Sequence, residues 1–293
     1  VAKERITGDL VAIQCKYYDS ATIIQKGHID SFLNEIGKKY YASGIIVASS
    51  PNWSNNAENA LKDRDKKIAR IGFEDLLNSH IDWSKYSPSK AEAVTPLKPR
   101  KTPRPHQVEA IEAAIEGFKE QDRGKLIMAP GTGKTYTSLQ IAESLAKEKD
   151  GQFRVLYLVP SIQLLSQSLR GWTGDSIYAN DMNTIAVCSD RNVTRKESQN
   201  VEFDISVADI GYPATTNSQK LLEYKNTIEE KNIDNKFLVV FSTYQSVEVI
   251  SQAQQQGFYE FDLIVADEAH RTTGATMLGE NGSAFVQVHN NKV

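Results

Sequence analysis

The sequence predicts an α/β protein with two units, each built on a mainly parallel sheet. Short apolar segments alternate with segments of helical periodicity through residues 1–86 and again from about residue 101. In the second part the apolar segments are continuous, as strands covered on both faces of a sheet require. One of these segments runs through a glycine-rich turn into a helix, an arrangement typical of phosphate binding.

Length, charge and cysteine content restrict the class of protein. With 293 residues the chain is long enough for two domains, because single cores stop growing at roughly 250 to 300 residues. The formal net charge of −3 means that any DNA-binding surface must be a local patch. No apolar run reaches the ~18 residues of a membrane helix. Cys15 and Cys188 lie in apolar runs, which predicts buried, reduced thiols in an intracellular protein.

The first unit should begin with a hairpin whose turn falls at Gly8, followed by the strand "DLVAIQCKYY" (9–18). Apolar residues at helical spacing predict a helix over 28–40. The expected inward side chains of this helix are Ile29, Phe32, Leu33 and Ile36. The remaining expected elements are a strand over 44–49, a helix over 55–63, a strand over 67–72 and a helix over 73–81.

Residues 87–103 have the composition of a linker. Five of the nine prolines fall in residues 88–105, and six basic residues with a single acid fall in 85–104. Proline density predicts a semi-extended, solvated segment, and phosphate contacts are the less favoured interpretation of its basic residues.

The second unit, residues 104–293, should open with an amphipathic helix over 104–118, in which Pro105 occupies the first turn. Its predicted apolar stripe consists of Val108, Ile111, Ile115 and Phe118. Five strands are expected, at "KLIMA" (125–129), "RVLYLVP" (154–160), "TIAVCS" (184–189), "FLVVFST" (237–243) and "FDLIVAD" (261–267).

The stretch "APGTGKT" predicts a nucleotide site. Gly131 and Gly133, with Thr132 between them, let the backbone approach phosphate oxygens, Lys134 neutralises their charge, and Thr135 offers a hydroxyl to Mg²⁺. Met128 replaces the first glycine of the usual eight-residue pattern.

A second signal is the apolar strand that ends in "DEAH". Its Asp267 and Glu268 are the carboxylates that a nucleotide site needs, one for Mg²⁺ and one to orient water. Parallel strands bring such ends to one edge of a sheet. We therefore expect ATP or GTP to bind at this edge.

These motifs resemble motifs I and II of superfamily 2 helicases and translocases, and "RPHQ" resembles the adenine-reading segment before motif I. The resemblance implies a RecA-like domain that binds ATP with Mg²⁺. Gln107 would contact adenine, and Lys134 and Thr135 the phosphates and the metal. Asp267 would hold Mg²⁺ through water, Glu268 would orient the attacking water, and His270 would couple the nucleotide to DNA.

Two further segments, "LVPSIQLLSQ" (158–167) and "FSTYQS" (241–246), resemble motifs Ia and Ib, which contact the DNA backbone in that family and would place Thr243 near DNA. The second RecA-like domain of the family has no counterpart in these residues. Because an arginine from that domain can contribute about 10³- to 10⁵-fold in related hydrolases, we expect residues 1–293 alone to bind ATP weakly and hydrolyse it slowly.

Gln14 and Lys16 share one face of the first unit's central strand, with Ala12, and the opposite face of Val11, Ile13 and Cys15 is expected to be the buried one. This Gln-x-Lys strand resembles the PD-(D/E)xK nuclease fold in its Mrr-like branch. The resemblance makes Lys16 the residue that stabilises developing charge or activates water, and Gln14 a weak Mg²⁺ ligand.

The acid of such a nuclease site normally lies on the preceding strand. The sequence offers only Glu4 there and Asp9 in the turn, and neither fits well. The acid is therefore expected just upstream of Val1, and residues 1–293 alone should not cut DNA.

A nuclease followed by a motor resembles type ISP restriction–modification enzymes, to which "AIQCKYY", "IQKGHIDSF", "RIGFEDLLNSHIDW", "VCSDRNV" and "VFSTYQS" are similar. The resemblance implies a bacterial cytoplasmic enzyme that acts on double-stranded DNA. It also implies downstream domains in the same polypeptide: a second RecA-like domain, an S-adenosylmethionine-dependent methyltransferase and a target-recognition domain.

Two alternatives remain at this point. One is a repair or remodelling helicase whose first domain is an inert DNA-binding module. The other is a nucleotide-gated binding module without productive hydrolysis, against which the complete DEAH sequence argues, because a pure switch has no need of Glu268.

Overall fold

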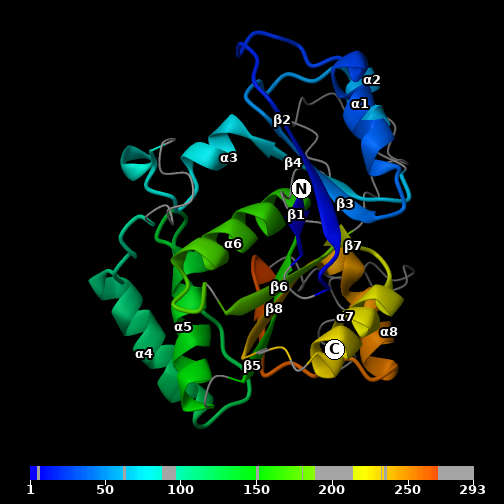
Figure 1. The fold of residues 1–293 in the computed structure, drawn as a ribbon. Coiled ribbons are helices and arrows are strands. Elements are labelled where there is room, and N and C mark those ends of the chain that lie inside the picture. The colour runs from blue at the N-terminus through cyan, green and yellow to red at the C-terminus, as the bar shows by residue number, and fades with distance from the viewer. Residues whose placement is uncertain are drawn as a thin grey trace, which may run out of the picture.

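The computed structural model describes residues 1–4, 7–61, 64–87, 97–149, 152–179, 181–188, 214–231, 233 and 236–269. Within them the chain forms a smaller α/β unit with a four-stranded sheet and a larger one with a five-stranded sheet (Figure 1). This arrangement confirms the predicted fold class.

The front sheet has the order β1-β2-β3-β4. Its strands are β1 (Ala2–Lys3), β2 (Leu10–Lys16), β3 (Tyr41–Ala48) and β4 (Ile68–Gly72). The pair β1/β2 is antiparallel, and the turn between them contains Gly8 with a φ of 77°. The pairs β2/β3 and β3/β4 are parallel. Both the hairpin and the mainly parallel sheet were predicted correctly.

Three helices accompany this sheet: α1 (Lys26–Ile36), α2 (Asn55–Leu61) and the short α3 (Phe73–Leu77). In α1 the buried side chains are Ile29, Phe32, Leu33 and Ile36, as the spacing predicts. They form one core with Ile46 of β3 and Ile68 of β4.

Of the face of β2 that was expected to be buried, Val11 is buried, at 7% exposure, and the prediction was wrong for Ile13 and Cys15. Ala12 is buried in the core with α1, whereas Ile13 is 40% exposed and Cys15 is exposed. Alternation defines two faces but does not say which one a helix covers, and α1 lies on the Ala12 side. Gln14 and Lys16 therefore continue the helix-covered face and are half-buried.

The second sheet is entirely parallel, in the order β7-β6-β8-β5-β9. Its strands are β5 (Phe153–Val159), β6 (Met182–Val187), β7 (Ala214–Thr215), β8 (Phe237–Thr243) and β9 (Leu263–Ala266). All seven residues of β8 are buried. Its odd-numbered side chains enter one core and its even-numbered ones the other, so both faces are covered.

Helices α4 (Pro105–Phe118), α5 (Lys134–Glu148) and α6 (Ile162–Asp175) lie on one side of this sheet. Helices α7 (Ser218–Glu230) and α8 (Val247–Gln255) lie on the other (Figure 1). Two 3₁₀ turns are η1 (Trp83–Lys85) and η5 (Tyr244–Ser246). The apolar stripe predicted for α4 is only partly covered, with Val108 38% exposed, because α4 packs mainly on α5.

The strand predicted at "KLIMA" is absent from the described structure. Residues 125–129 have no strand assignment, and Ile127 is 86% exposed. An apolar segment becomes a strand only when a neighbour accepts its backbone hydrogen bonds. In the described part of the chain the sheet ends at β9, and no strand there pairs with 125–129. The other four strand predictions are confirmed.

Cys188 is buried as predicted, and Cys15 is exposed, so the expectation of two buried thiols holds for only one of them. Among the described residues, no helix combines the length and apolar character needed to cross a membrane.

Candidate functional sites

The glycine-rich loop opens directly into α5. Gly131 and Gly133 have φ values of 76° and 89°, in the left-handed region that favours glycine, and Gly133 caps the helix. Thr132 closes the turn, because its hydroxyl donates to the carbonyl of Ala129 at 2.6 Å. Lys134 is the first residue of α5, so its ammonium and the free backbone N–H groups share the positive end of the helix.

Gln107 holds this loop. Its side chain is 5% exposed, its Oε1 accepts from the backbone N–H of Arg104 at 2.9 Å, and its Nε2 donates to the carbonyl of Thr132 at 2.8 Å. Both halves of the amide are thus used to tie the start of α4 to the phosphate loop. The adenine contact implied for Gln107 stays a prediction.

Alanine at position 133 should disturb this loop for two reasons. The position needs a positive φ, and an added β-carbon would collide with the amide of Gln107. We expect Gly133→Ala to weaken ATP affinity about tenfold or more, since strain of roughly 1 to 3 kcal/mol must be relieved by moving the loop. Equilibrium titration with a fluorescent ATP analogue measures this change. Gly124→Ala is the matched control, because a β-carbon there meets no atom within 4 Å, and an equal loss in both variants would contradict the assignment.

The two carboxylates follow β9, and the first of them, Asp267, is held by two tyrosines. Tyr157 Oη donates to Asp267 Oδ2 at 3.3 Å, and Tyr244 Oη donates to the backbone carbonyl of Asp267 at 2.8 Å. Burial, together with the charge of Asp267, raises the pKa of Tyr157 to about 12, so its phenol stays protonated and donates. The backbone N–H of Glu268 donates to Asp267 Oδ1 at 3.0 Å, so both carboxylate oxygens of Asp267 are fixed.

Lys134 and Glu268 meet across the site. Lys134 Nζ lies 2.8 Å from Glu268 Oε1, although the two residues are 134 positions apart in the sequence. The hydrogen bond that Lys134 donates to Glu268 raises the pKa of Lys134, which keeps the ammonium charged. Glu268 has a φ of 54°, a strained value for a residue with a side chain. The residue predicted to bind phosphate and the residue predicted to orient water therefore lie side by side in one site.

The predicted Mg²⁺ residues also converge. The hydroxyl of Thr135 and the carboxylate of Asp267 both neighbour the phenol of Tyr157. A hydroxyl and a carboxylate are oxygen ligands of the kind that Mg²⁺ takes beside nucleotide phosphates. Neither tyrosine was predicted to support the ATP site, because Tyr157 lies in an apolar strand and Tyr244 lies in the segment 241–246, which was interpreted as a DNA-contacting motif.

Two residues were predicted to couple the site to DNA. Thr243 ends β8 with 4% exposure, and its hydroxyl donates to Ser246 Oγ at 3.2 Å. Its role at DNA stays a prediction. His270 lies outside the described residues.

The nuclease strand places Gln14 and Lys16 on one face, as alternation predicts. Gln14 Oε1 is buried and has no hydrogen-bond partner among the described residues. A buried amide oxygen without a partner is unfavourable by roughly 1 to 3 kcal/mol, which is typical of an atom kept for a ligand.

Glu4 and Asp9 do not reach this face. Leu10 pairs with Lys3 and Val11 with Ala2, so each step along β2 moves the partner one step back along β1. The partner of Ala12 would be Val1, and Gln14 lies two positions farther. Glu4 instead lies beside the turn, where its Oε2 accepts from the backbone N–H of Thr7. The described residues contain no group of three or more acidic, histidine or cysteine side chains placed to hold a metal.

Two family models match the chain. One, described as a restriction endonuclease of the Mrr catalytic type, matches residues 1–93. The other, described as the res subunit of type III restriction enzymes, matches residues 100–291. They confirm the predicted succession of an Mrr-like nuclease domain and a helicase-type domain.

Similar proteins extend this result. The type ISP restriction–modification enzyme LlaBIII, solved bound to DNA, is 49% identical with a TM-score of 0.85, over 99% of this chain and 18% of that one. A nuclease-deletion mutant of the type ISP enzyme LlaGI, in complex with a DNA substrate mimic, is 52% identical with a TM-score of 0.53. That match covers 66% of this chain and 16% of the other.

The endonuclease subunit of the type I restriction enzyme EcoAI from Escherichia coli is 29% identical over 177 residues, which are 58% of this chain and 16% of that protein. The chain thus spans less than a fifth of the length of each of these relatives. The res-subunit model covers more than half of the 293 residues, and an endonuclease domain of the Mrr type precedes it. The chain therefore belongs to the family of type III restriction enzyme res subunits.

Proposed function

We propose that residues 1–293 are the front part of an ATP-dependent DNA restriction enzyme. ATP hydrolysis in the second unit would drive translocation along double-stranded DNA, and the first unit would cleave DNA with Mg²⁺. The observation that carries this proposal is the 2.8 Å contact between Lys134 and Glu268. It lies in the unit that follows, along the chain, a domain with a Gln-x-Lys strand.

At the ATP site, each role follows from position. Lys134 would bind the β- and γ-phosphates, for which it must exchange its contact with Glu268. Thr135 and Asp267 would hold Mg²⁺, which supplies positive charge to the phosphate oxygens when bound. Glu268, released from Lys134, would orient the attacking water. Gln107 would contact adenine while remaining close to the loop that it supports.

At the nuclease site, Lys16 would stabilise negative charge on the scissile phosphate, and Gln14 Oε1 would be one metal ligand. One amide oxygen is fewer than the ligands that Mg²⁺ takes. We propose that the acid comes from a residue outside residues 1–293, on an extension of β1 past Val1. The register of β1 and β2 supports this proposal, because the position facing Gln14 lies beyond Val1.

The relatives point to partners of the same kind. LlaBIII was solved bound to DNA and LlaGI with a DNA substrate mimic. We propose double-stranded DNA as the substrate of this chain too. We also propose further domains in the same polypeptide: a second RecA-like domain, a target-recognition domain and a methyltransferase that uses S-adenosylmethionine. The predicted limits of 1–86, 87–103 and 104–293 remain our proposal for the domains.

The test replaces Lys16 with alanine in the full-length polypeptide that contains these residues. We expect DNA cleavage to fall about 10²-fold or more, since a charge-stabilising group at a reacting phosphate contributes on this scale. DNA-stimulated ATP hydrolysis should stay within about twofold of the wild type, because Lys16 lies in the other unit. Cleavage is measured on supercoiled plasmid and ATP hydrolysis by phosphate release.

Glu4→Ala is the matched control and should leave cleavage unchanged, because Glu4 lies beside the hairpin turn. Undiminished cleavage by the Lys16→Ala protein would contradict the nuclease assignment. It would favour the alternative in which the first unit only binds DNA.

A further inference from the structure

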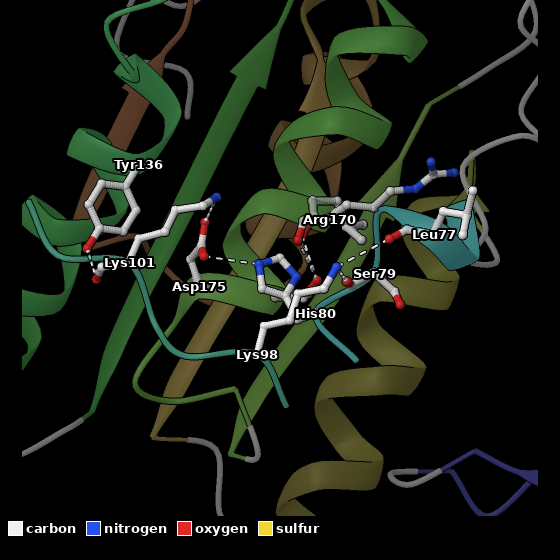
Figure 2. Close-up of polar contacts among 10 residues, drawn as sticks. Leu77, Ser79, His80, Lys98, Lys101, Tyr136, Arg170 and Asp175 are labelled. Carbon is white, nitrogen blue, oxygen red and sulfur yellow. Dashed lines mark hydrogen bonds and ion pairs between the residues drawn. The ribbon is translucent and has the colours of Figure 1, made fainter. Parts of the chain in front are cut away.

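The last two turns of α6 contact both the phosphate loop and the front unit. Figure 2 shows residues from α3, the segment after it, the second half of the predicted linker and α6 coming together. These segments are far apart in the sequence, so the contacts come from the relative placement of the two units. Six residues define what we call the α6 joint: Arg170, Gly174 and Asp175 of α6 with Asp75, His80 and Lys101.

Asp175 is the centre of the joint. The residue is only 6% exposed, and its carboxylate accepts from His80 Nε2 at 3.0 Å and from Lys101 Nζ at 2.7 Å (Figure 2). A carboxylate at the C-terminal end of a helix opposes the helix dipole. If His80 is removed, Asp175 keeps the ammonium of Lys101 but loses one of the two donors to its buried carboxylate, and a buried acceptor that loses a hydrogen bond is destabilising. His80 therefore connects the front unit directly to a buried carboxylate of α6.

Two more contacts fix the direction of approach. Arg170 forms an ion pair with Asp75 of α3. A β-carbon on Gly174 would overlap the imidazole of His80, so the ring fits α6 only where the helix has no side chain. Charge and shape thus select one placement of the front unit on α6.

The phosphate loop touches the same turns from the other side. Trp172 Nε1 donates to the backbone carbonyl of Thr135 at 3.1 Å, and Gly171 lies against the methyl group of Thr135. Tyr136 Oη donates to the carbonyl of Lys101 at 2.7 Å. The residue predicted to hold Mg²⁺ is therefore one hydrogen bond away from a helix that holds the front unit.

The linker takes part in the joint and is not simply solvated. Lys98 Nζ donates to the carbonyls of Leu77 and Ser79, at 3.2 Å and 2.7 Å. Arg100 donates to the carbonyl of Ile177 just after α6, at 3.3 Å. These basic side chains bind protein groups of both units, which leaves them less available for phosphates.

We propose that His80 and Asp175 are positioning residues, which hold the nuclease unit on α6 so that the state of the phosphate loop determines where the nuclease meets DNA. This inference rests on the proposed function and names the contact through which the nuclease and the ATP site would be connected. Breaking the joint should separate the two activities. DNA cleavage would be lost, and ATP hydrolysis would continue.

The experiment uses a reversible bond in place of the native contact. Because a β-carbon at position 174 falls among the ring atoms of His80, cysteines at both positions are within disulfide reach. In the full-length polypeptide, His80→Ala and the reduced double variant His80→Cys/Gly174→Cys should cleave DNA about ten- to a hundredfold more slowly, the scale of loss from misplacing a reacting group by about 1 Å. Oxidation of the double variant should restore cleavage to within about threefold of the wild type, and reduction should remove it again. DNA-stimulated ATP hydrolysis should stay within about twofold throughout.

The single variants His80→Cys and Gly174→Cys, treated with the same oxidant, are the controls and should not recover. A residue that matters only for folding gives no reversible recovery, so this readout separates positioning from stability. The inference would be overturned by unchanged cleavage in His80→Ala or by an equal loss of ATP hydrolysis. It would also be overturned if the disulfide bond failed to form, or if thiol titration showed the bond but cleavage did not recover. Failure of the proposed function itself appears separately, as continued cleavage by the Lys16→Ala protein.

Discussion

Replacing Glu268 with glutamine should lower DNA-stimulated ATP hydrolysis by about 10²- to 10⁴-fold, the range contributed by a positioned acid–base residue. ATP binding should be retained and somewhat tighter. In the wild type, Lys134 must leave Glu268 before it can bind phosphates, and the glutamine variant removes that ion pair. The size of the side chain is kept, so the loop and β9 should not move. Hydrolysis is followed in the full-length polypeptide by phosphate release, and affinity by titration with a fluorescent ATP analogue.

Glu260→Gln provides the control. Glu260 is an exposed acid shortly before β9 and should leave both quantities unchanged. Hydrolysis at the wild-type rate in the Glu268→Gln protein would remove Glu268 from the reaction. A loss of ATP binding equal to the loss of hydrolysis would instead mean that the residue serves the structure of the site.

Trp172→Ala should destabilise the second unit strongly, by about 3 to 5 kcal/mol for loss of a buried aromatic side chain. Trp172 has no exposed surface and packs edge-on against Tyr157 and Phe241, with ring centroids 5.1 Å and 5.8 Å away. Its indole N–H also binds the carbonyl of Thr135 at 3.1 Å, so the phosphate loop loses a support. Urea unfolding monitored by circular dichroism gives the change in the free energy of unfolding.

Trp172→Phe separates packing from hydrogen bonding. It keeps an aromatic ring in the cavity and removes one donor to the carbonyl of Thr135, which still accepts from Ser138 Oγ at 2.9 Å. We therefore expect a smaller loss of about 0.5 to 1.5 kcal/mol. Trp83→Ala is a second comparison, because Trp83 is 39% exposed in the front unit. If Trp172→Ala unfolds at the same urea concentration as Trp83→Ala, the core around β8 is not the main source of stability.

Periodicity in the sequence predicts the elements well and their burial less well. The stripe of α1 is correct because a helix with a single apolar side has only one way to cover a core. The strand β2 has apolar residues on both faces, and Ala12 was less apolar than Ile13 and Cys15. Which face is buried depends on the side of the sheet on which α1 packs, and the sequence of the strand itself does not determine that side. The segment "KLIMA" was wrongly predicted for a similar reason. It has the composition of a strand, but a strand also needs a neighbour to pair with, and composition does not show whether one is present.

The candidate ATP site was predictable to the extent that it consists of local motifs. The loop that contains Lys134 and the strand that ends at Glu268 are each contiguous, and parallel strands bring their ends together. Gln107, Tyr157 and Asp175 act through partners that are distant in the sequence, such as Asp175 with His80 across 95 positions. No spacing rule connects such residues, so their contacts had to come from the structure.

At Gly174 the stability of α6 and the attachment of the front unit favour different residues. Glycine within a helix is less favourable than alanine by about 1 kcal/mol, so α6 taken alone would gain from a methyl group at this position. The same methyl group would displace the ring of His80 and with it one of the two partners of a buried carboxylate. Selection for a more stable motor domain and selection for an attached nuclease therefore act in opposite directions on one residue. A variant chosen for thermal stability of the second unit alone would carry a defect that becomes visible only when the first unit is present.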